Sequence, residues 1–92
     1  MYNYDMTIET TTQIWREGKH YIAHALPLDV SSAGDTPESA RAALREAINL
    51  FITTAREHGT LDDVLEECGY LLQQGTWVAP RIVAQDKDLV AV

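Results

Sequence analysis

The chain has too few cysteines, bases and apolar runs for several classes of protein. Cys68 is the single cysteine among 92 residues, which excludes an intramolecular disulfide and an all-cysteine metal site. Seven Lys and Arg oppose fourteen Asp and Glu, giving a net charge of -7. Because phosphate backbones are bound by clustered bases, this balance disfavours a general nucleic-acid binder. No apolar run approaches the roughly 18 residues of a membrane span, and the N-terminus lacks a signal-peptide pattern. We therefore expect a cytoplasmic protein without a membrane segment.

The length and composition predict one small folded domain over residues 1–92. The chain is 46% hydrophobic and 23% charged, as in ordinary globular domains. We divide it into a core module, residues 1–70, and a C-terminal strand segment, residues 71–92. Residues 76–92 carry two acids and two bases and are therefore neutral, which favours a buried or shared strand. A core this small favours a homodimer or a higher homo-oligomer.

The first third of the chain has the period of two that is typical of strands. Residues 6–14 alternate apolar and polar side chains in a threonine-rich stretch, which predicts a strand with one buried face. Gly18 suits a tight turn, and His20–Leu26 then forms the returning strand of a hairpin. Val30–Ala33 is a third, shorter strand.

The middle of the chain predicts two helices. Thr36 followed by Pro37 is the pattern of an N-cap and first helical residue, and Gly59 provides a stop. Between them the apolar residues recur every three or four positions: Ala40, Ala43, Leu44, Ala47, Ile48, Phe51 and Ala55. A shorter helix follows Thr60, whose spacing to Asp63 resembles a capping box, and Gly69 ends it.

The C-terminal segment predicts one strand over residues 77–84, with a turn at 86–88 leading to a final short strand over 89–92. The element order is then β-β-β-α-α-β, and the strand over 89–92 would be one more at the end. The expected fold class is α+β, with two layers: one antiparallel sheet packed against one long helix.

Residues that could carry catalysis are scattered. His20 and His24 share a strand face but lie about 13 Å apart, too far to bind one metal ion. Asp29 and Asp35 flank a short strand without a third matched ligand, and Cys68 lies on the apolar stripe of an acidic helix, where its thiol is inert. The glycines are isolated and form no phosphate-binding loop. We expect no enzyme, and no catalytic residue, metal or cofactor.

Two surfaces remain as candidate binding sites. The shorter helix presents four acids without a base, and they form either a solvated face or an anionic docking surface for a basic partner: Asp62, Asp63, Glu66 and Glu67. The neutral C-terminal segment offers apolar residues for strand addition or packing across a two-fold axis: Trp77, Val78, Ile82 and Val83.

Four stretches together resemble the HicB family of antitoxins. Tyr21-Ile22-Ala23 is similar to a family strand that reads YVA. It leads to Leu28-Asp29-Val30-Ser31-Ser32-Ala33-Gly34-Asp35-Thr36-Pro37-Glu38-Ser39-Ala40, which ends in a stretch similar to the family's GDT-x-E-E-A helix start. Leu44-Arg45-Glu46-Ala47-Ile48-Asn49-Leu50-Phe51 is similar to its L-x-E-A helix continuation. The stretch Thr60-Leu61-Asp62-Asp63-Val64-Leu65-Glu66-Glu67-Cys68-Gly69-Tyr70 resembles its second helix. The resemblance spans residues 6–70, and Ser39 stands where the family usually has glutamate.

The resemblance implies a partial RNase H-like module without nuclease activity. Such modules neutralise a small basic toxin, a HicA-like RNase, by masking its active site. The family's C-terminal DNA-binding segment has no counterpart in residues 76–92, so direct DNA binding is disfavoured. The alternative is an orphan homo-oligomeric HicB-like domain that has neither toxin nor catalytic activity.

Overall fold

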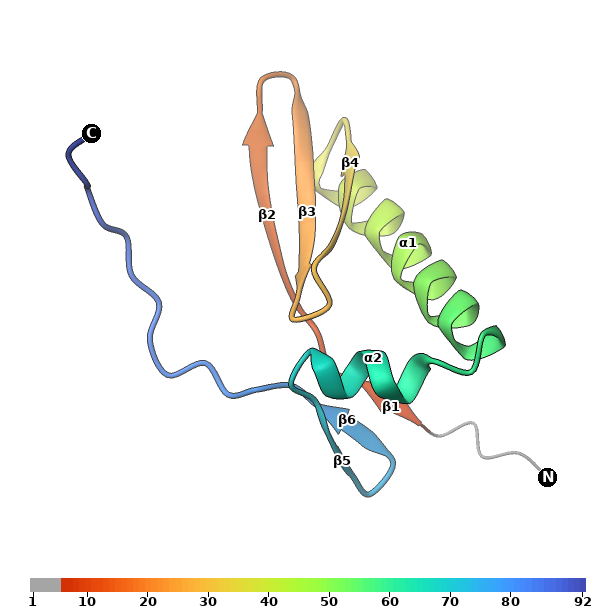
Figure 1. Ribbon diagram of the computed structural model, residues 1–92. Coiled ribbons are helices and arrows are strands. Elements are labelled where there is room, and N and C mark those ends of the chain that lie inside the picture. Colours follow the sequence, from red (N-terminus) through yellow and green to blue (C-terminus); the bar gives the residue numbers. More distant parts are fainter. Residues whose placement is uncertain (1–5) are drawn as a thin grey trace.

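The computed structural model describes residues 6–92, which form eight elements in chain order (Figure 1). They are β1 (Thr7–Ile8), β2 (Thr11–Glu17), β3 (His20–Leu26), β4 (Val30–Gly34), α1 (Pro37–Glu57), α2 (Leu61–Glu67), β5 (Leu71–Gln73) and β6 (Thr76–Val78). The predicted α+β class is confirmed, and the long helix packs on an antiparallel sheet.

The larger sheet is the antiparallel meander β2-β3-β4, in that spatial order. A two-residue turn joins β2 to β3, and Gly18 takes a φ of 59° there, a left-handed conformation that glycine adopts without steric cost. The register pairs Ile14 with Ala23 and Ala25 with Val30, which brings these four side chains to one face. β2 lies at one edge of the sheet, and no described strand pairs with its outer side.

α1 covers that face, and its first turn is held by a reciprocal capping box. The Ser39 backbone N–H donates to the Thr36 hydroxyl, and the Thr36 N–H donates to the Ser39 hydroxyl, both at 3.0 Å. The predicted N-cap is therefore confirmed, with serine in the reciprocal role. The fully buried residues between helix and sheet are Ala23, Ala25, Ala40 and Leu44. Three of these four are alanines, which lets the helix backbone approach the sheet closely.

A second, smaller sheet combines residues 7–8 with two strands near the C-terminal end and packs on a second group of buried residues. The order is β1-β6-β5, with β1 parallel and β5 antiparallel to the central β6. α2 packs on this sheet through Leu65, which is fully buried. The buried residues of this second core are Leu28, Leu65, Tyr70 and Trp77.

The structure differs from the sequence predictions in several details. The strand predicted over residues 6–14 is divided, because residues 7–8 pair with β6 whereas the chain from Thr11 onward pairs with β3. The Thr60 side chain does not cap α2, because its hydroxyl donates instead to the Ala55 carbonyl at 3.3 Å.

The third difference lies at the C-terminal end. The strand predicted over 77–84 ends at Val78, and the one predicted over 89–92 is absent, since residues 79–92 have no regular structure. We call residues 81–92 the tail; they are exposed throughout (Figure 1). The structure also contains β5, which the sequence did not predict, and the single predicted antiparallel sheet is two three-stranded sheets.

Candidate protein-binding surfaces

The outer face of α2 is a compact acidic surface. Its four carboxylates are exposed, whereas Leu65 on the opposite side anchors the helix in the second core: Asp62, Asp63, Glu66 and Glu67. Within residues 6–92 the ion pairs involve histidines only, so no lysine or arginine of this part of the chain forms an ion pair with these carboxylates. The last turn of α2 also contains no base. We refer to these four residues as the acidic face.

The two histidines each contact a different aspartate. His20 Nδ1 lies 3.3 Å from an Asp35 carboxylate oxygen, and His24 Nε2 lies 2.6 Å from an Asp29 carboxylate oxygen. Among the described residues no three His, Cys, Asp or Glu side chains gather closely enough to hold a metal ion. His20 begins β3 and Asp35 follows β4, whereas His24 lies within β3 and Asp29 precedes β4, so each pair links β3 to residues beside β4.

The face of the larger sheet opposite α1 carries a partly exposed tryptophan. Trp15 is 41% exposed, and its ring meets the His24 ring edge-on at a centroid distance of 6.2 Å. The Trp15 indole N–H donates to the Glu17 carboxylate at 3.2 Å. Trp15 pairs with Ile22 across the strands, so an apolar strip of this face is open to solvent beside the edge of β2.

The four residues expected to mediate self-association separate into two pairs. Trp77 is only 5% exposed and belongs to the second core, and Val78 is half-buried on the same strand. Because β6 is the central strand of its sheet, neither residue offers a free edge. Ile82 and Val83 lie in the tail and are 58% and 89% exposed, so these two remain available.

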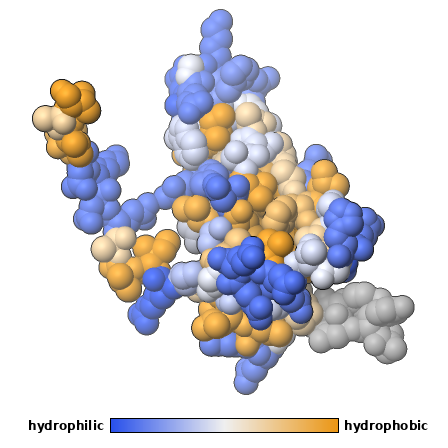
Figure 2. Space-filling model, viewed as in Figure 1, coloured by the Kyte–Doolittle hydropathy of each residue, from blue (hydrophilic) through white to orange (hydrophobic). Residues whose placement is uncertain are grey.

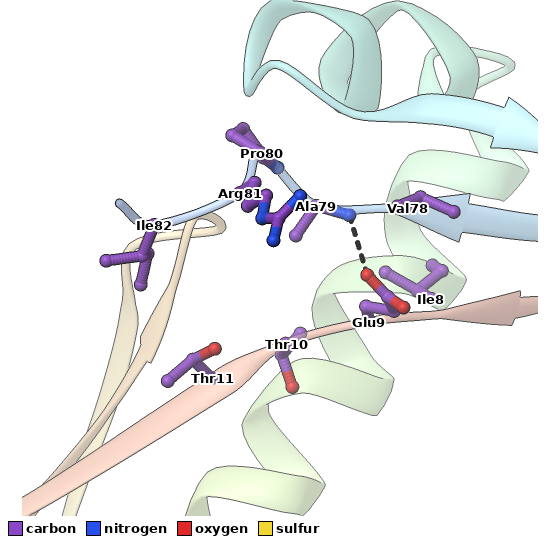
Figure 3. Close-up of a pocket in the computed structure, with 9 residues that line it drawn as sticks. All are labelled: Ile8, Glu9, Thr10, Thr11, Val78, Ala79, Pro80, Arg81 and Ile82. Carbon is purple, nitrogen blue, oxygen red and sulfur yellow. Dashed lines mark hydrogen bonds between the residues drawn. The ribbon is translucent and has the colours of Figure 1, made fainter. Parts of the chain in front are cut away.

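Glu9 joins three parts of the chain that are distant in sequence. Its backbone carbonyl accepts a hydrogen bond from the Tyr70 hydroxyl, and its carboxylate accepts one from the Ala79 N–H at 3.0 Å (Figure 3). Burial raises the pKa of Tyr70 to about 12, and the nearby Cys68 and Glu9 add to this shift. Sequence reasoning treated Glu9 only as a polar position of a strand, because nothing local indicates partners 61 and 70 residues away.

Beyond Glu9, the chain leading into β2 and the chain leading into the tail move apart. A pocket of about 830 Å³ opens between them, lined on one side by Thr10 and Thr11 and on the other by Arg81 and Ile82 (Figure 3). No histidine or cysteine lines the pocket. The carboxylate that lines it belongs to Glu9 and already accepts a hydrogen bond from the Ala79 N–H. The pocket lies between two stretches of backbone, and Glu9 and Arg81 are its charged lining residues.

Comparisons with protein-family models, with curated proteins and with solved structures found no match for this chain. The similarity to HicB antitoxins therefore stays a prediction from the residues quoted above. In the part of the chain that the structure describes, neither helix combines the length and hydropathy needed to cross a bilayer.

Proposed function

We propose that this chain is a protein-binding module of the HicB antitoxin type, which neutralises a small basic, HicA-like RNase by masking its active site. In this proposal the chain is not an enzyme, needs no cofactor and acts in the cytoplasm, where such an RNase meets RNA. The single observation that carries the proposal is the acidic face, four exposed carboxylates with no basic partner in the described chain.

Charge and rigidity both support this assignment. A protein with a net charge of -7 attracts a basic partner at long range and accelerates their encounter. The carboxylates lie on a helix whose opposite side is fixed by the fully buried Leu65, so their spacing is set before a partner arrives. Such preorganisation lowers the entropic cost of association.

A pull-down from the native host tests the proposal. The tagged chain should co-purify a small basic protein that dissociates at high salt and is identified by mass, and adding the purified chain should inhibit RNA cleavage by that protein. A Glu66→Lys, Glu67→Lys variant should lose at least tenfold in affinity, whereas a control with the same charge change elsewhere, Glu17→Lys, Glu46→Lys, should lose much less. Equal affinities for the two variants would refute the acidic face as the binding site.

A second candidate function is an orphan domain that associates only with itself. The exposed apolar residues of the tail favour this alternative; they include Leu89 and Val90 in addition to Ile82 and Val83. Recovery of the bait alone from the host, together with an oligomeric mass for the purified chain, would support the orphan domain over the antitoxin.

A further inference from the structure

The tail combines a strand-forming composition with little packing against the rest of residues 6–92. Two apolar runs, residues 82–84 and 89–92, are separated by a charged stretch, and Figure 2 shows the same alternation as two hydrophobic groups around a hydrophilic one. Val83 is 89% exposed and Val92 fully so. β-Branched residues favour strands, yet those of the tail belong to no strand of residues 6–92.

The outer edge of β2 offers complementary unpaired backbone groups. Thr12 pairs in register with Ala25, whose carbonyl accepts the Asp29 N–H at 2.8 Å and therefore points toward β4. Antiparallel ladders alternate, so the backbone N–H and C=O of Thr12 and of every second residue, Ile14 and Arg16, point away from β3. β2 contains no lysine or proline, the residues that commonly protect a strand edge.

The structure separates the tail from the β2 of its own chain. β1 and β6 run parallel, and the ladder bond from Glu9 N–H to the Trp77 carbonyl, 3.0 Å long, would continue with Ala79 N–H donating to the Glu9 carbonyl. Instead that carbonyl accepts the Tyr70 hydroxyl, and the Ala79 N–H is taken by the Glu9 side chain. Pro80 follows and has no N–H to donate. The parallel ladder ends here, and the pocket of Figure 3 opens.

Charge and length identify a second copy of this chain as the partner of the edge. The tail carries two acids and two bases, and β2 carries Arg16 and Glu17, so both are neutral within a chain of net charge -7. Two copies repel each other least where these segments meet. The tail, residues 81–92, reaches about 40 Å when extended, and the seven residues of β2 span about 23 Å.

We propose that two copies exchange tails, each tail adding as a fourth strand to the outer edge of β2 in the other copy. The contact is reciprocal, so it closes into a two-fold dimer. It would pair the outward backbone groups of Thr12, Ile14 and Arg16 and bury apolar residues of the tail. The inference rests on the self-association named above and is independent of what the acidic face binds.

Light scattering after size exclusion, at micromolar concentration and on full chains, tests the exchange. Wild type should have twice the 10.3 kDa mass of one chain. A donor-blocked variant, Val83→Pro with Val90→Pro, should be monomeric, because proline removes the strand donors. Both residues are largely exposed, at 89% and 77%, so the substitutions should leave the fold intact. The matched control, Val83→Thr with Val90→Thr, keeps the backbone N–H groups and should remain dimeric.

An acceptor-blocked variant completes the design. Thr12→Pro removes an outward N–H and should be monomeric, whereas Thr12→Ala should remain dimeric. Mixing the donor-blocked and acceptor-blocked chains should restore a heterodimer, because one intact tail then meets one intact edge. A wild-type monomer would overturn self-association and exchange together. A dimer that persists in the donor-blocked variant would overturn the exchange alone, whatever the fold of the Thr12→Pro chain.

Discussion

At the residue scale, Tyr70 links the second core to the N-terminal strand through one hydrogen bond. Its hydroxyl donates to the Glu9 carbonyl, and its ring is only 2% exposed. Replacing it with phenylalanine keeps the ring and leaves the carbonyl without this donor. We expect Tyr70→Phe to cost about 1 kcal/mol of unfolding free energy at pH 7.

The raised pKa of Tyr70 makes this cost depend on pH. The phenol has an ordinary pKa of 10.0 when unfolded and about 12 when folded. Below pH 10 both states are protonated and the contribution of Tyr70 is complete; between pH 10 and 12 the unfolded state loses its proton first, so wild type loses stability. The Phe variant lacks this loss. Urea denaturation from pH 8 to 12 should show the advantage of wild type shrinking above pH 10 and reversing toward pH 12, and a constant difference would contradict the assignment.

Gly34 is the second position where one residue decides the packing. A Cβ built there would lie 2.5 Å from the Ala40 backbone nitrogen and 2.8 Å from the Ser39 carbonyl carbon. Since those atoms belong to the backbone of the first helical turn, the helix would have to move. Gly34→Ala should therefore cost about 1–3 kcal/mol, measured by thermal or urea unfolding.

Gly18 supplies the matched control for Gly34. It takes a positive φ of 59°, and a Cβ there meets no atom within 4 Å. Asparagine tolerates this left-handed conformation better than other non-glycine residues, so Gly18→Asn should be nearly neutral. An equal loss in both variants would show that glycine is needed at Gly34 for backbone flexibility and not for the close approach of α1.

At the scale of elements, the carboxylates of the acidic face that serve binding have different effects on the stability of α2, depending on their position in the helix. Asp62 and Asp63 lie in the first turn of α2, where negative charge interacts favourably with the helix dipole, whereas Glu66 and Glu67 lie near its negative end. Glu66→Lys with Glu67→Lys should therefore stabilise the fold by about 0.3–1 kcal/mol per site, and Asp62→Lys with Asp63→Lys should destabilise it similarly.

Unfolding curves of the two double variants, at low ionic strength, check this prediction. Its value for the proposed function is that Glu66 and Glu67 can be reversed without weakening the helix. A loss of partner binding in that variant then reports on charge at the surface. Equal stabilities of both variants in low salt would contradict the helix-dipole argument.

The elements that the sequence predicts correctly are those with local signals. Thr36, Pro37 and Gly59 bound α1 through capping chemistry within a few residues, and the hairpin around Gly18 follows from the period of two. Where a strand changes sheets or stops depends on distant partners. The division after Ile8, and the end of β6 at Val78, depend on contacts between Glu9, Tyr70 and Ala79 that no local pattern contains.

The candidate surfaces follow the same rule. The exposure of the acidic face follows from its helical spacing against the buried Leu65, and the structure agrees. The buried position of Trp77 does not follow from the sequence, because an apolar strand residue packs equally well in a core or at an interface. Only the pairing of β6 between β1 and β5 settles that its side chain is internal.

At the scale of the whole molecule, the two proposed interfaces differ in their electrostatics. The acidic face lies in a chain of net charge -7 and would bind a basic protein through attraction that salt screens. The exchanged tail and β2 are both neutral, so their association relies on backbone hydrogen bonds and apolar burial. Salt also screens the repulsion between two acidic copies and therefore favours their dimer.

We accordingly expect opposite salt dependences from one purified protein. Between 0.1 and 1 M salt the Debye length falls from about 10 to about 3 Å, so the association rate with a basic partner should fall by tenfold or more. Over the same range the dimer dissociation constant should stay constant or decrease. Stopped-flow mixing with the partner measures the association rate, and light scattering of the chain alone at a series of concentrations measures the dimer dissociation constant. If salt dissociated the dimer as readily as the complex with the basic partner, the two-fold contact would have to be ionic. The neutral tail would then not be its main component.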